Sequence, residues 1–302
     1  LVTSPPLFVG ITAYILSKIK KIPYIFEIRD LWPESAIDTG ILKNKMIIKL
    51  AYWVEAFLYK RALLINVLTP AFRTHLIEKK SVDPKKIIFI PNAADFDLSE
   101  KLLKNFDALF FKKQLGWEDK FVILYVGAHG VANHLEQILD TAVLLQHTNA
   151  LFVLIGDGMS KKALMENAKN KNITNVLFLD PVSKNDIFKY ILASDMGASV
   201  LKKADAFKTV YSNKTFDYMS CKKPILMAID GVSRQLVEEA DAGAFVEPEN
   251  PEHFCAVISY YLSNKDKMIL QGENGYRFAK QNFDRNVLAN KYIEEINKVI
   301  LR

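Results

Sequence analysis

The sequence contains too few cysteines for a framework of disulfide bonds or for a zinc site built from thiolates. Its 302 residues include only Cys221 and Cys255, and such sparse use is typical of a reducing compartment. Glycine and proline are also scarce, at 12 and 11 residues, which excludes the fibrous and disordered classes. The five histidines are scattered without metal-ligand spacing, and neither a Ser-His-Asp order nor a Cys-His pair stands out.

Long hydrophobic runs are missing as well. The longest, LFVGITAYIL at 7–16, is shorter than the ~18 residues that span a bilayer, and no basic region precedes it as in a signal peptide. The chain opens with Leu1, and LVTSPP is typical of a strand that ends in a turn. We therefore expect that the natural N-terminus is missing.

What the sequence does contain is a repeated pattern of strand and helix. The apolar segments are rich in Val, Ile, Leu and Phe with little alternation, as in parallel strands that are buried on both faces. The predicted strands are Pro23–Ile28, Leu64–Leu68, Ile87–Ile90, Phe121–Val126, Leu151–Ile155, Val176–Leu179, Gly197–Leu201, Pro224–Ala228 and Ala244–Val246. The helical patterns between them include His134–His147, Ser160–Asn170 and Lys184–Ala193. This order predicts doubly wound α/β sheets.

The polar stretch Asp95–Asp119 interrupts this rhythm and carries no convincing strand. A second strand–helix series begins at Phe121, so we place a domain boundary within the polar stretch. The length allows two domains of about 100–200 residues each.

The net charge is +6, and the excess of cations lies mostly in the first 100 residues, with 14 Lys and Arg against 10 Asp and Glu. This excess is too small to indicate nucleic acid on its own. It is explained either by an ordinary solvated surface, which we favour, or by attraction to anionic lipid headgroups.

A glycine loop follows the strand at Phe121–Val126, in YVGAHGVANHLEQIL. Gly127 and Gly130 allow a tight turn close to a ligand, and the helix start after them favours phosphate. The alternative is a plain turn in which His129 or Asn133 caps the helix. The spacing fits neither a dinucleotide fingerprint nor a P-loop.

The stretch FKTVYSNKTFDYMSCKKPIL is the most informative. Ser212 or Asn213 can cap a short helix, and Lys208 and Lys214 lie before and at its start, where an anion is favoured. Asp217, one turn later, can accept both hydroxyl groups of a ribose. The alternative is a surface ion pair between Lys214 and Asp217, which would contribute little.

Charged residues also follow the predicted strand at Pro23–Ile28. Arg29, Asp30 and Glu34 surround a Trp-Pro pair at the strand's carboxyl end, where ligands gather in open α/β sheets. Either these residues act on a ligand, or Arg29 pairs with Asp30 or Glu34 and only holds the loop.

Taken together and in order, several segments resemble glycosyltransferase family 4, in the bacterial branch of L-fucosamine and related aminosugar transferases of surface polysaccharides such as O-antigen or capsule. The segments are TSPPLF (3–8), EIRDLWPES (27–35), FLYKRA (57–62), IPNAAD (90–95), YVGAHG (125–130), LIGDG (154–158) and SNKTFDYMSCKKPIL (212–226).

This resemblance implies a GT-B fold, in which two Rossmann-like domains face each other across a cleft and the first is here incomplete. The expected parts are a partial acceptor-side domain over 1–105, a nucleotide-sugar domain over 106–283, and a helix over 284–302 that packs back toward the first domain. Two strand–helix units, about 90 residues, would be absent from the first domain, and the activity of the fragment is then in question.

The resemblance also implies site residues. The Gly127–Gly130 loop would approach the donor diphosphate, Lys208 and Ser212–Lys214 would bind its charge, and Val182 would lie near the base. Asp217 stands where the family's second Glu of Glu-x7-Glu binds ribose, and Arg29-Asp30 would face the transferred sugar. In this chain Asp217 is one methylene shorter than that Glu.

Two further departures from the family pattern are Thr209, in place of the first Glu of that motif, and Asp180, in place of a Gly.

The implied function is a retaining, metal-independent transfer of a sugar, expected to be an N-acetylaminosugar, from a UDP-linked donor to a polyprenyl-diphosphate-linked glycan. No cofactor is expected, and the enzyme would lie on the cytoplasmic face of the cell membrane, bound to its anionic surface. The apolar face of the helix Lys43–Arg61 would serve lipid contact or ordinary core packing. The alternatives are a nucleotide-sugar epimerase of the same fold and a non-catalytic nucleotide-binding fragment.

Overall fold

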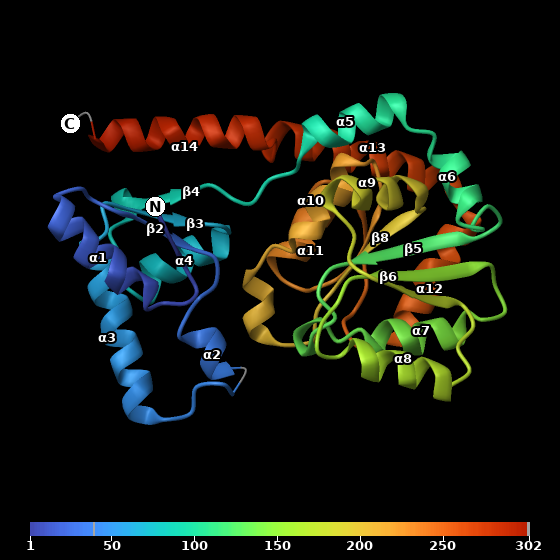
Figure 1. The fold of residues 1–302 in the computed structure, drawn as a ribbon, viewed down its shortest axis with the longest axis horizontal. Helices are drawn as coiled ribbons and strands as arrows, with labels where there is room; N and C mark the ends of the chain where they lie inside the picture. The colour runs from blue at the N-terminus through green and yellow to red at the C-terminus, as the bar shows by residue number, and fades with distance from the viewer. Residues whose placement is uncertain (39, 301–302) are drawn as a thin grey trace. The chain divides into compact units, whose positions relative to one another are not determined.

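The computed structural model describes residues 1–38 and 40–300, and the chain divides into two compact units (Figure 1). The first unit comprises Leu1–Asn92, Thr209–Tyr211 and the C-terminal segment from Asn286 onward, and the second comprises Ala93–Lys208 and Ser212–Arg285. The units therefore separate after Asn92, earlier than the boundary at 105 expected from the sequence.

The first unit is built on a four-stranded parallel sheet in the order β1-β2-β3-β4. Its strands are β1 (Val2–Ser4), β2 (Ile25–Ile28), β3 (Leu64–Val67) and β4 (Ile87–Phe89). Its helices are α1 (Val9–Lys20), α2 (Glu34–Asp38), α3 (Lys45–Arg61), α4 (Pro70–Glu78) and most of α14 (Arg285–Ile300). Because the strands are parallel, the residues that follow each of them lie at one edge of the sheet.

The packing of α1 on α3 explains a glycine in the middle of an apolar segment. A Cβ atom on Gly10 would lie 2.5 Å from Cδ1 of Leu58, so any larger residue would force the Leu58 side chain to shift at this close approach of the two helices. The start of α3 is fixed by Asn44, whose side chain accepts hydrogen bonds from the backbone N–H groups of Met46 and Ile47.

The second unit is built on a six-stranded parallel sheet in the order β10-β9-β8-β5-β6-β7. Its strands are β5 (Phe121–Val126), β6 (Ala150–Ile155), β7 (Val176–Leu179), β8 (Met196–Val200), β9 (Ile225–Ala228) and β10 (Gly243–Phe245). The chain leaves β5 toward β7 on one side and returns to β8 on the other. The order therefore reverses between β5 and β8, as in a Rossmann fold, and ligands bind at such switch points.

Helices cover both faces of this second sheet (Figure 1). They are α5 (Phe96–Asn105), α6 (Ala108–Gln114), α7 (Glu136–Leu144), α8 (Lys161–Asn170), α9 (Lys184–Ala193), α10 (Asn213–Ser220), α11 (Val232–Glu239), α12 (Pro251–Ser263) and α13 (Lys265–Asn282). The helices α5 and α6 pack against α9. Because of this packing, the polar stretch Asp95–Asp119, where the sequence predicts the domain boundary, belongs to the second unit.

Tyr218 of α10 fills the switch point from within the sheet. A Cβ atom on Gly197 of β8 would lie 2.3 Å from the Tyr218 ring, so this position in β8 must be glycine. Its hydroxyl accepts a hydrogen bond from Val126 N at 3.1 Å and donates one to Leu124 O at 3.0 Å. The tyrosine therefore fixes α10 against the carboxyl end of β5.

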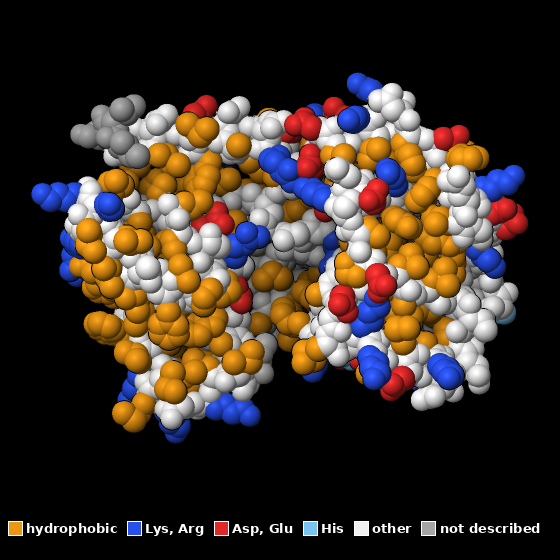
Figure 2. Space-filling model, in the orientation of Figure 1, with side chains coloured by type: hydrophobic (Ala, Val, Ile, Leu, Met, Phe, Trp, Pro, Cys, Tyr) orange, Lys and Arg blue, Asp and Glu red, His pale blue; other side chains and the backbone are white. Residues whose placement is uncertain are grey.

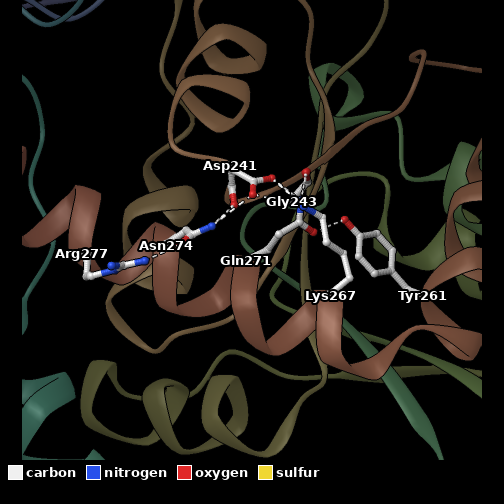
Figure 3. A network of polar contacts seen from close by, with 7 residues as sticks. All are labelled: Asp241, Gly243, Tyr261, Lys267, Gln271, Asn274 and Arg277. Atoms are coloured by element: carbon white, nitrogen blue, oxygen red, sulfur yellow. Dashed lines mark hydrogen bonds and ion pairs between the residues drawn. The ribbon is translucent and has the colours of Figure 1, made fainter.

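The far end of the second unit is held by a polar network around Asp241 (Figure 3). Gln271 of α13 donates from Nε2 to Asp241 at 2.8 Å and to Gly243 O at 2.9 Å, and accepts from the Tyr261 hydroxyl at 2.6 Å. Lys267 adds an ion pair to the same carboxylate. These donors satisfy the carboxylate and the buried amide, so the network fastens α13 to β10.

The α/β fold class predicted from the sequence is confirmed. Every predicted strand forms, with ends shifted by at most two residues. The predicted helix Lys184–Ala193 matches α9, while His134–His147 shortens to α7 (Glu136–Leu144).

We expect Tyr218→Phe to lower the free energy of unfolding by about 1–3 kcal/mol, because Val126 N–H is left in the interior without an acceptor. Thermal and urea unfolding measure the loss. Tyr260, whose side chain is 52% exposed, provides the control variant Tyr260→Phe, which should change stability by less than about 0.5 kcal/mol. Equal losses in the two variants would contradict the bridging function of the Tyr218 hydroxyl.

Candidate functional site

The carboxyl end of β5 runs into a glycine loop that is locked to the loop after β6. Gly127 has a φ of 142°, and its N–H donates to Ile155 O at 3.0 Å. A Cβ atom on Gly156 would lie 1.9 Å from Gly127 O, and one on Gly158 would lie 2.5 Å from His129 O. The two loops therefore meet backbone to backbone, and the LIGDG turn is structural.

His129 supports this loop from inside. It is fully buried, its N–H donates to Asp157 O at 2.8 Å and its carbonyl accepts from Ser160 N at 2.9 Å. Burial lowers the pKa of the imidazole, and the charge of Lys161 lowers that pKa further. Because the ring is buried in this conformation, we expect the backbone of the loop, rather than this side chain, to contact a ligand.

Lys214, in the first turn of α10, lies directly beside the glycine loop. Its Nζ is 4.7 Å from the centroid of the Tyr125 ring and would be 3.7 Å from a Cβ atom on Gly127. Burial lowers the pKa of this ammonium to about 8. Among residues 1–38 and 40–300 no carboxylate pairs with it, and the alternative of a Lys214–Asp217 ion pair is therefore not formed.

The start of α10 adds to the positive potential of this lysine. No side chain caps the helix, because the hydroxyl of Ser212 is bonded to Ser199 Oγ at 2.6 Å. Ser212 is buried, whereas Asn213 is exposed. An uncapped helix start next to a buried ammonium is suited to an anion such as a diphosphate.

Lys208 lies in a different setting. It is half exposed and pairs with Asp205 at 2.8 Å, and this hydrogen bond raises the pKa of the ammonium. With Arg234 it lines a cavity of about 530 Å³ at the carboxyl ends of β8, β9 and β10. Asp205 partly screens its charge, so Lys214, which pairs with no carboxylate among the described residues, is the stronger candidate for the diphosphate.

Asp217 lies one turn further along α10 and is half-buried. Burial raises the pKa of its carboxyl group to about 6, against the opposing charges of Lys184 and Arg285. Those two cations both pair with Asp95, at 3.0 and 2.6 Å. No hydrogen bond within the described part of the chain reaches the Asp217 carboxylate, which leaves its oxygens available to ribose hydroxyl groups.

The remaining predicted donor residues lie around this centre. Gly130 closes the loop and accepts from Asn133 N at 3.0 Å, and Asn133 belongs to a short 3-10 turn rather than capping α7. Val182 follows β7 just before α9 and is 37% exposed. The structure thus gathers the glycine loop, Lys214 and Asp217 through α10.

At the strand-end edge of the first unit, Arg29 is exposed. Its backbone N–H donates to Ser4 O at 2.9 Å, and its guanidinium makes one long contact of 3.5 Å with Asn92 Oδ1. Over the described residues it forms no ion pair, so it does not hold the loop by pairing with Asp30 or Glu34.

Asp30 and Glu34 have partners of their own. Asp30 accepts from Ser35 Oγ at 2.6 Å, while burial raises the pKa of its carboxyl group. Burial would raise the pKa of Glu34 too, but hydrogen bonds from His75 and Lys80 outweigh it and bring that pKa to about 2. Glu34 is therefore part of a structural ion-pair network.

Some contributors were not identified from the sequence. Tyr125 and Tyr218 lie in apolar segments, where aromatic residues are ordinarily core. Lys184, Asp95 and Arg285 are far apart in sequence and meet only in the fold.

Comparison with known proteins places the chain in a family. Residues 107–278 match the model described as glycosyl transferases group 1. WbjE of Pseudomonas aeruginosa, named as a glycosyltransferase, is 24% identical over 239 residues, which cover 78% of this chain and 58% of WbjE. WcaI of Escherichia coli (strain K12), named for colanic acid biosynthesis, is 24% identical over 304 residues, 97% of this chain and 72% of WcaI. The chain thus spans less than two thirds of WbjE.

Solved structures share the fold. Anabaena Alr3699/HepE, crystallised in complex with UDP, superposes with a TM-score of 0.80 at 18% identity over 97% of this chain and 77% of that one. Sucrose-phosphate synthase from Thermosynechococcus elongatus superposes with a TM-score of 0.74 at 15% identity, over 98% of this chain and 72% of that one. The two parallel-sheet units are those of a GT-B glycosyltransferase. Because the family model covers more than half of its residues, the chain belongs to the family of glycosyl transferases group 1.

Proposed function

We propose that the chain is a retaining glycosyltransferase that moves a sugar, an N-acetylaminosugar, from a UDP-linked donor to a lipid-linked glycan in bacterial surface-polysaccharide synthesis. One observation carries the proposal: the Lys214 ammonium lies beside Gly127 at the sheet's switch point, and within the described residues no carboxylate balances it. The names of WcaI and WbjE, and the UDP bound by Alr3699/HepE, support this choice of reaction and donor.

The donor diphosphate would lie between the glycine loop and the start of α10. There Lys214 and the helix N-terminus stabilise the negative charge that grows on the departing UDP. Lys208 would add a weaker, screened attraction from the neighbouring cavity. We keep metal independence as part of the proposal, because these fixed positive groups already face the position of the leaving charge.

The transfer exchanges one bond for another at the sugar's C1. The bond from C1 to the β-phosphate oxygen breaks, and its electron pair leaves on that oxygen. The acceptor hydroxyl forms the new bond on the same face, and its proton passes to the departing phosphate. The protein acts mainly by positioning and by charge, so it needs no nucleophile of its own.

The other residues would hold the two ends of the donor. Asp217 accepts the ribose hydroxyl groups, and Val182 contacts the base. Arg29 and Asp30 act on the sugar or the acceptor. Glu34 takes part only indirectly, by holding the loop that carries Arg29 and Asp30.

The lipid-linked acceptor places the proposed enzyme at the cytoplasmic face of the membrane. In the described part of the chain, no helix combines the length and hydrophobicity that crossing a bilayer requires. Because the proposed acceptor is carried by lipid, we propose that the enzyme attaches peripherally to that membrane.

The first prediction concerns the diphosphate. Lys214→Met should weaken UDP binding by about 10–100-fold, the loss of a charge-assisted hydrogen bond, while Lys208→Met should change it by at most about threefold because Asp205 already screens that charge. Calorimetry measures both affinities, with Lys162→Met as an exposed control. An unchanged dissociation constant for Lys214→Met would remove this lysine from the site.

The second prediction concerns Asp217 and pH. The folded pKa of about 6 exceeds the usual ~3.9 of Asp, so the ionised carboxylate lowers the free energy of unfolding above about pH 6 and has no such effect below about pH 4. Asp217→Asn should therefore raise the free energy of unfolding by about 1–3 kcal/mol at pH 7.5 and leave it unchanged at pH 4.

The same variant should weaken UDP binding about tenfold but leave 2′,3′-dideoxy-UDP unaffected, and wild-type affinity should fall below about pH 6 as Asp217 is protonated. Asp119→Asn, at an exposed position, is the control. Equal losses for the ribose and dideoxy ligands would show that Asp217 does not bind ribose.

The third prediction concerns turnover. Because Arg29 has no ion-pair partner to lose, Arg29→Ala should keep the melting temperature and the UDP affinity while lowering kcat at least tenfold, about 1.4 kcal/mol of barrier. Arg73→Ala, an exposed arginine of the same unit, should have normal turnover. Normal turnover of Arg29→Ala would exclude the catalytic function, and an altered UDP-sugar formed without acceptor would indicate epimerisation instead.

A further inference from the structure

A cavity of about 530 Å³ lies at the carboxyl edge of the second sheet, beside the proposed donor centre around Lys214. Its walls are the segments that follow β8, β9 and β10, with Arg234 of α11 and His253 of α12, and we call it the β8–β10 cavity. Its volume is in the range of ~300–1,000 Å³ that small-molecule sites have. The strand–helix units that the sequence analysis expects to be missing would extend the first unit, whereas the residues that line this cavity belong to the second.

The charges of this cavity are largely balanced. Lys203 pairs with Glu247 at 2.8 Å, and Lys208 pairs with Asp205 at 2.8 Å. Within the described residues, Lys202 is the lining lysine without an ion pair. This balance differs from the donor centre, so the cavity attracts a diphosphate only weakly. Figure 2 shows the same mixing of acidic and basic side chains over the visible face of the second unit.

Balanced ion pairs still offer hydrogen bonds. An ammonium has about three N–H donors and a carboxylate about four lone-pair positions, more than one ion pair occupies. A hydroxyl group both donates and accepts, so it can bridge the two partners of one pair. The cavity is therefore suited to a neutral ligand that carries several hydroxyl groups.

Arg234 shows this unused capacity most clearly. Its guanidinium lies over the Phe245 ring at 4.1 Å, and its Nε donates to Glu238 at 2.8 Å, so the plane of the group is fixed. Its Nη1 is 3.7 Å from Asp230 Oδ1, which is too long for a direct hydrogen bond. A ligand hydroxyl at this gap would accept from the arginine and donate to the carboxylate.

Apolar side chains complete the lining. Phe207 and Phe245 contribute aromatic rings, and Ile229 and Pro248 are buried in the wall. A pyranose combines the same two kinds of surface, because hydroxyl groups surround a ring whose C–H groups form an apolar face. A purely apolar ligand would remove water from the charged pairs without replacing its hydrogen bonds, and an anion would meet carboxylates as well as cations. A neutral sugar is thus the ligand class that matches the lining.

The strand order indicates which sugar this is. In the proposed function the donor lies along the sheet edge from Val182 after β7 to the glycine loop after β5, so its sugar would lie toward β8. The β10 wall, with Phe245 and Glu247, is three strand spacings from β5, about 14 Å. A single sugar ring attached to the diphosphate does not span this distance. The cavity therefore extends to sugar units beyond the transferred one, which are those of the acceptor.

We propose that the β8–β10 cavity binds a neutral sugar unit of the acceptor glycan, with hydroxyl groups at the Arg234–Asp230 gap and ring C–H groups against Phe207. The binding of a sugar follows from the lining alone, and only its assignment to the acceptor rests on the proposed function. A measurement with free sugars and without donor therefore tests the cavity separately from sugar transfer.

The experiment titrates methyl glycosides of glucose, galactose, fucose and N-acetylglucosamine into the protein and measures binding by saturation-transfer NMR. At least one should bind saturably. Asp230→Asn and Phe207→Ala should each weaken that binding at least about fivefold, through the lost carboxylate acceptor and the lost apolar contact. Both variants should keep the wild-type affinity for UDP, and saturating UDP should leave the sugar bound.

Matched controls are Asp119→Asn and Phe110→Ala, because both side chains are exposed in the second unit and do not line the cavity. Both should bind sugar like wild type. The proposal would be overturned by no saturable binding across the panel, or by unchanged binding in both cavity variants.

Two further outcomes would also contradict it. Tighter binding of glucose 6-phosphate than of methyl glucoside would indicate an anion site, and displacement of the sugar by UDP-N-acetylglucosamine would assign the cavity to the donor. Sugar binding that is lost in the cavity variants, in a protein that binds no UDP, would support the sugar site and contradict the proposed function instead.

Discussion

The hydroxyl of Tyr218 is the interaction on which the geometry of the candidate site depends. It takes a hydrogen bond from Val126 N and gives one to Leu124 O, and so lies where β5 and β8 begin to separate. The tyrosine ring occupies the space that a side chain at Gly197 would fill. Because Tyr218 belongs to α10, this one contact fixes the helix start beside the glycine loop and sets where Lys214 and Asp217 lie.

The two charges that α10 carries lie in surroundings that differ from those of Lys161 and Asp241 in the same unit. Lys161 is satisfied by two carbonyl oxygens and Asp180, and Asp241 is satisfied by Gln271 and its neighbours. Lys214 and Asp217 are desolvated and make no such hydrogen bonds among the described residues. Burial therefore shifts the pKa of each group in the direction that favours its uncharged form. Folding alone gains nothing from either charge, whereas a nucleoside diphosphate would supply an anion for one and hydroxyl donors for the other.

The sequence was sufficient to predict where the strands lie, because buried parallel strands are short runs of Val, Ile, Leu and Phe whatever surrounds them. It also names Lys208, Lys214 and Asp217 as candidates, because a helix start with lysines has a local signature; their part in binding stays a prediction. The sequence was not sufficient to predict the helix α5, because most residues of that segment are polar and the buried Phe96 does not stand out among them. It could not show that Asp205 pairs with Lys208 or that Glu34 pairs with Lys80, because the fold decides which of the available partners meet.

The ion pairs of Lys80 link the interior of the first unit to its surface. Lys80 joins Glu34 of α2 to Glu55 of α3; burial raises the pKa of Glu55, and the hydrogen bond and charge of Lys80 only partly oppose that rise. By turning the single acid of α3 inward and balancing it there, the network holds the loop after β2 in place. It also leaves only cations on the outer face of the helix. The half-buried Lys80 thus links the segment that follows Arg29 to the inward orientation of Glu55 on α3.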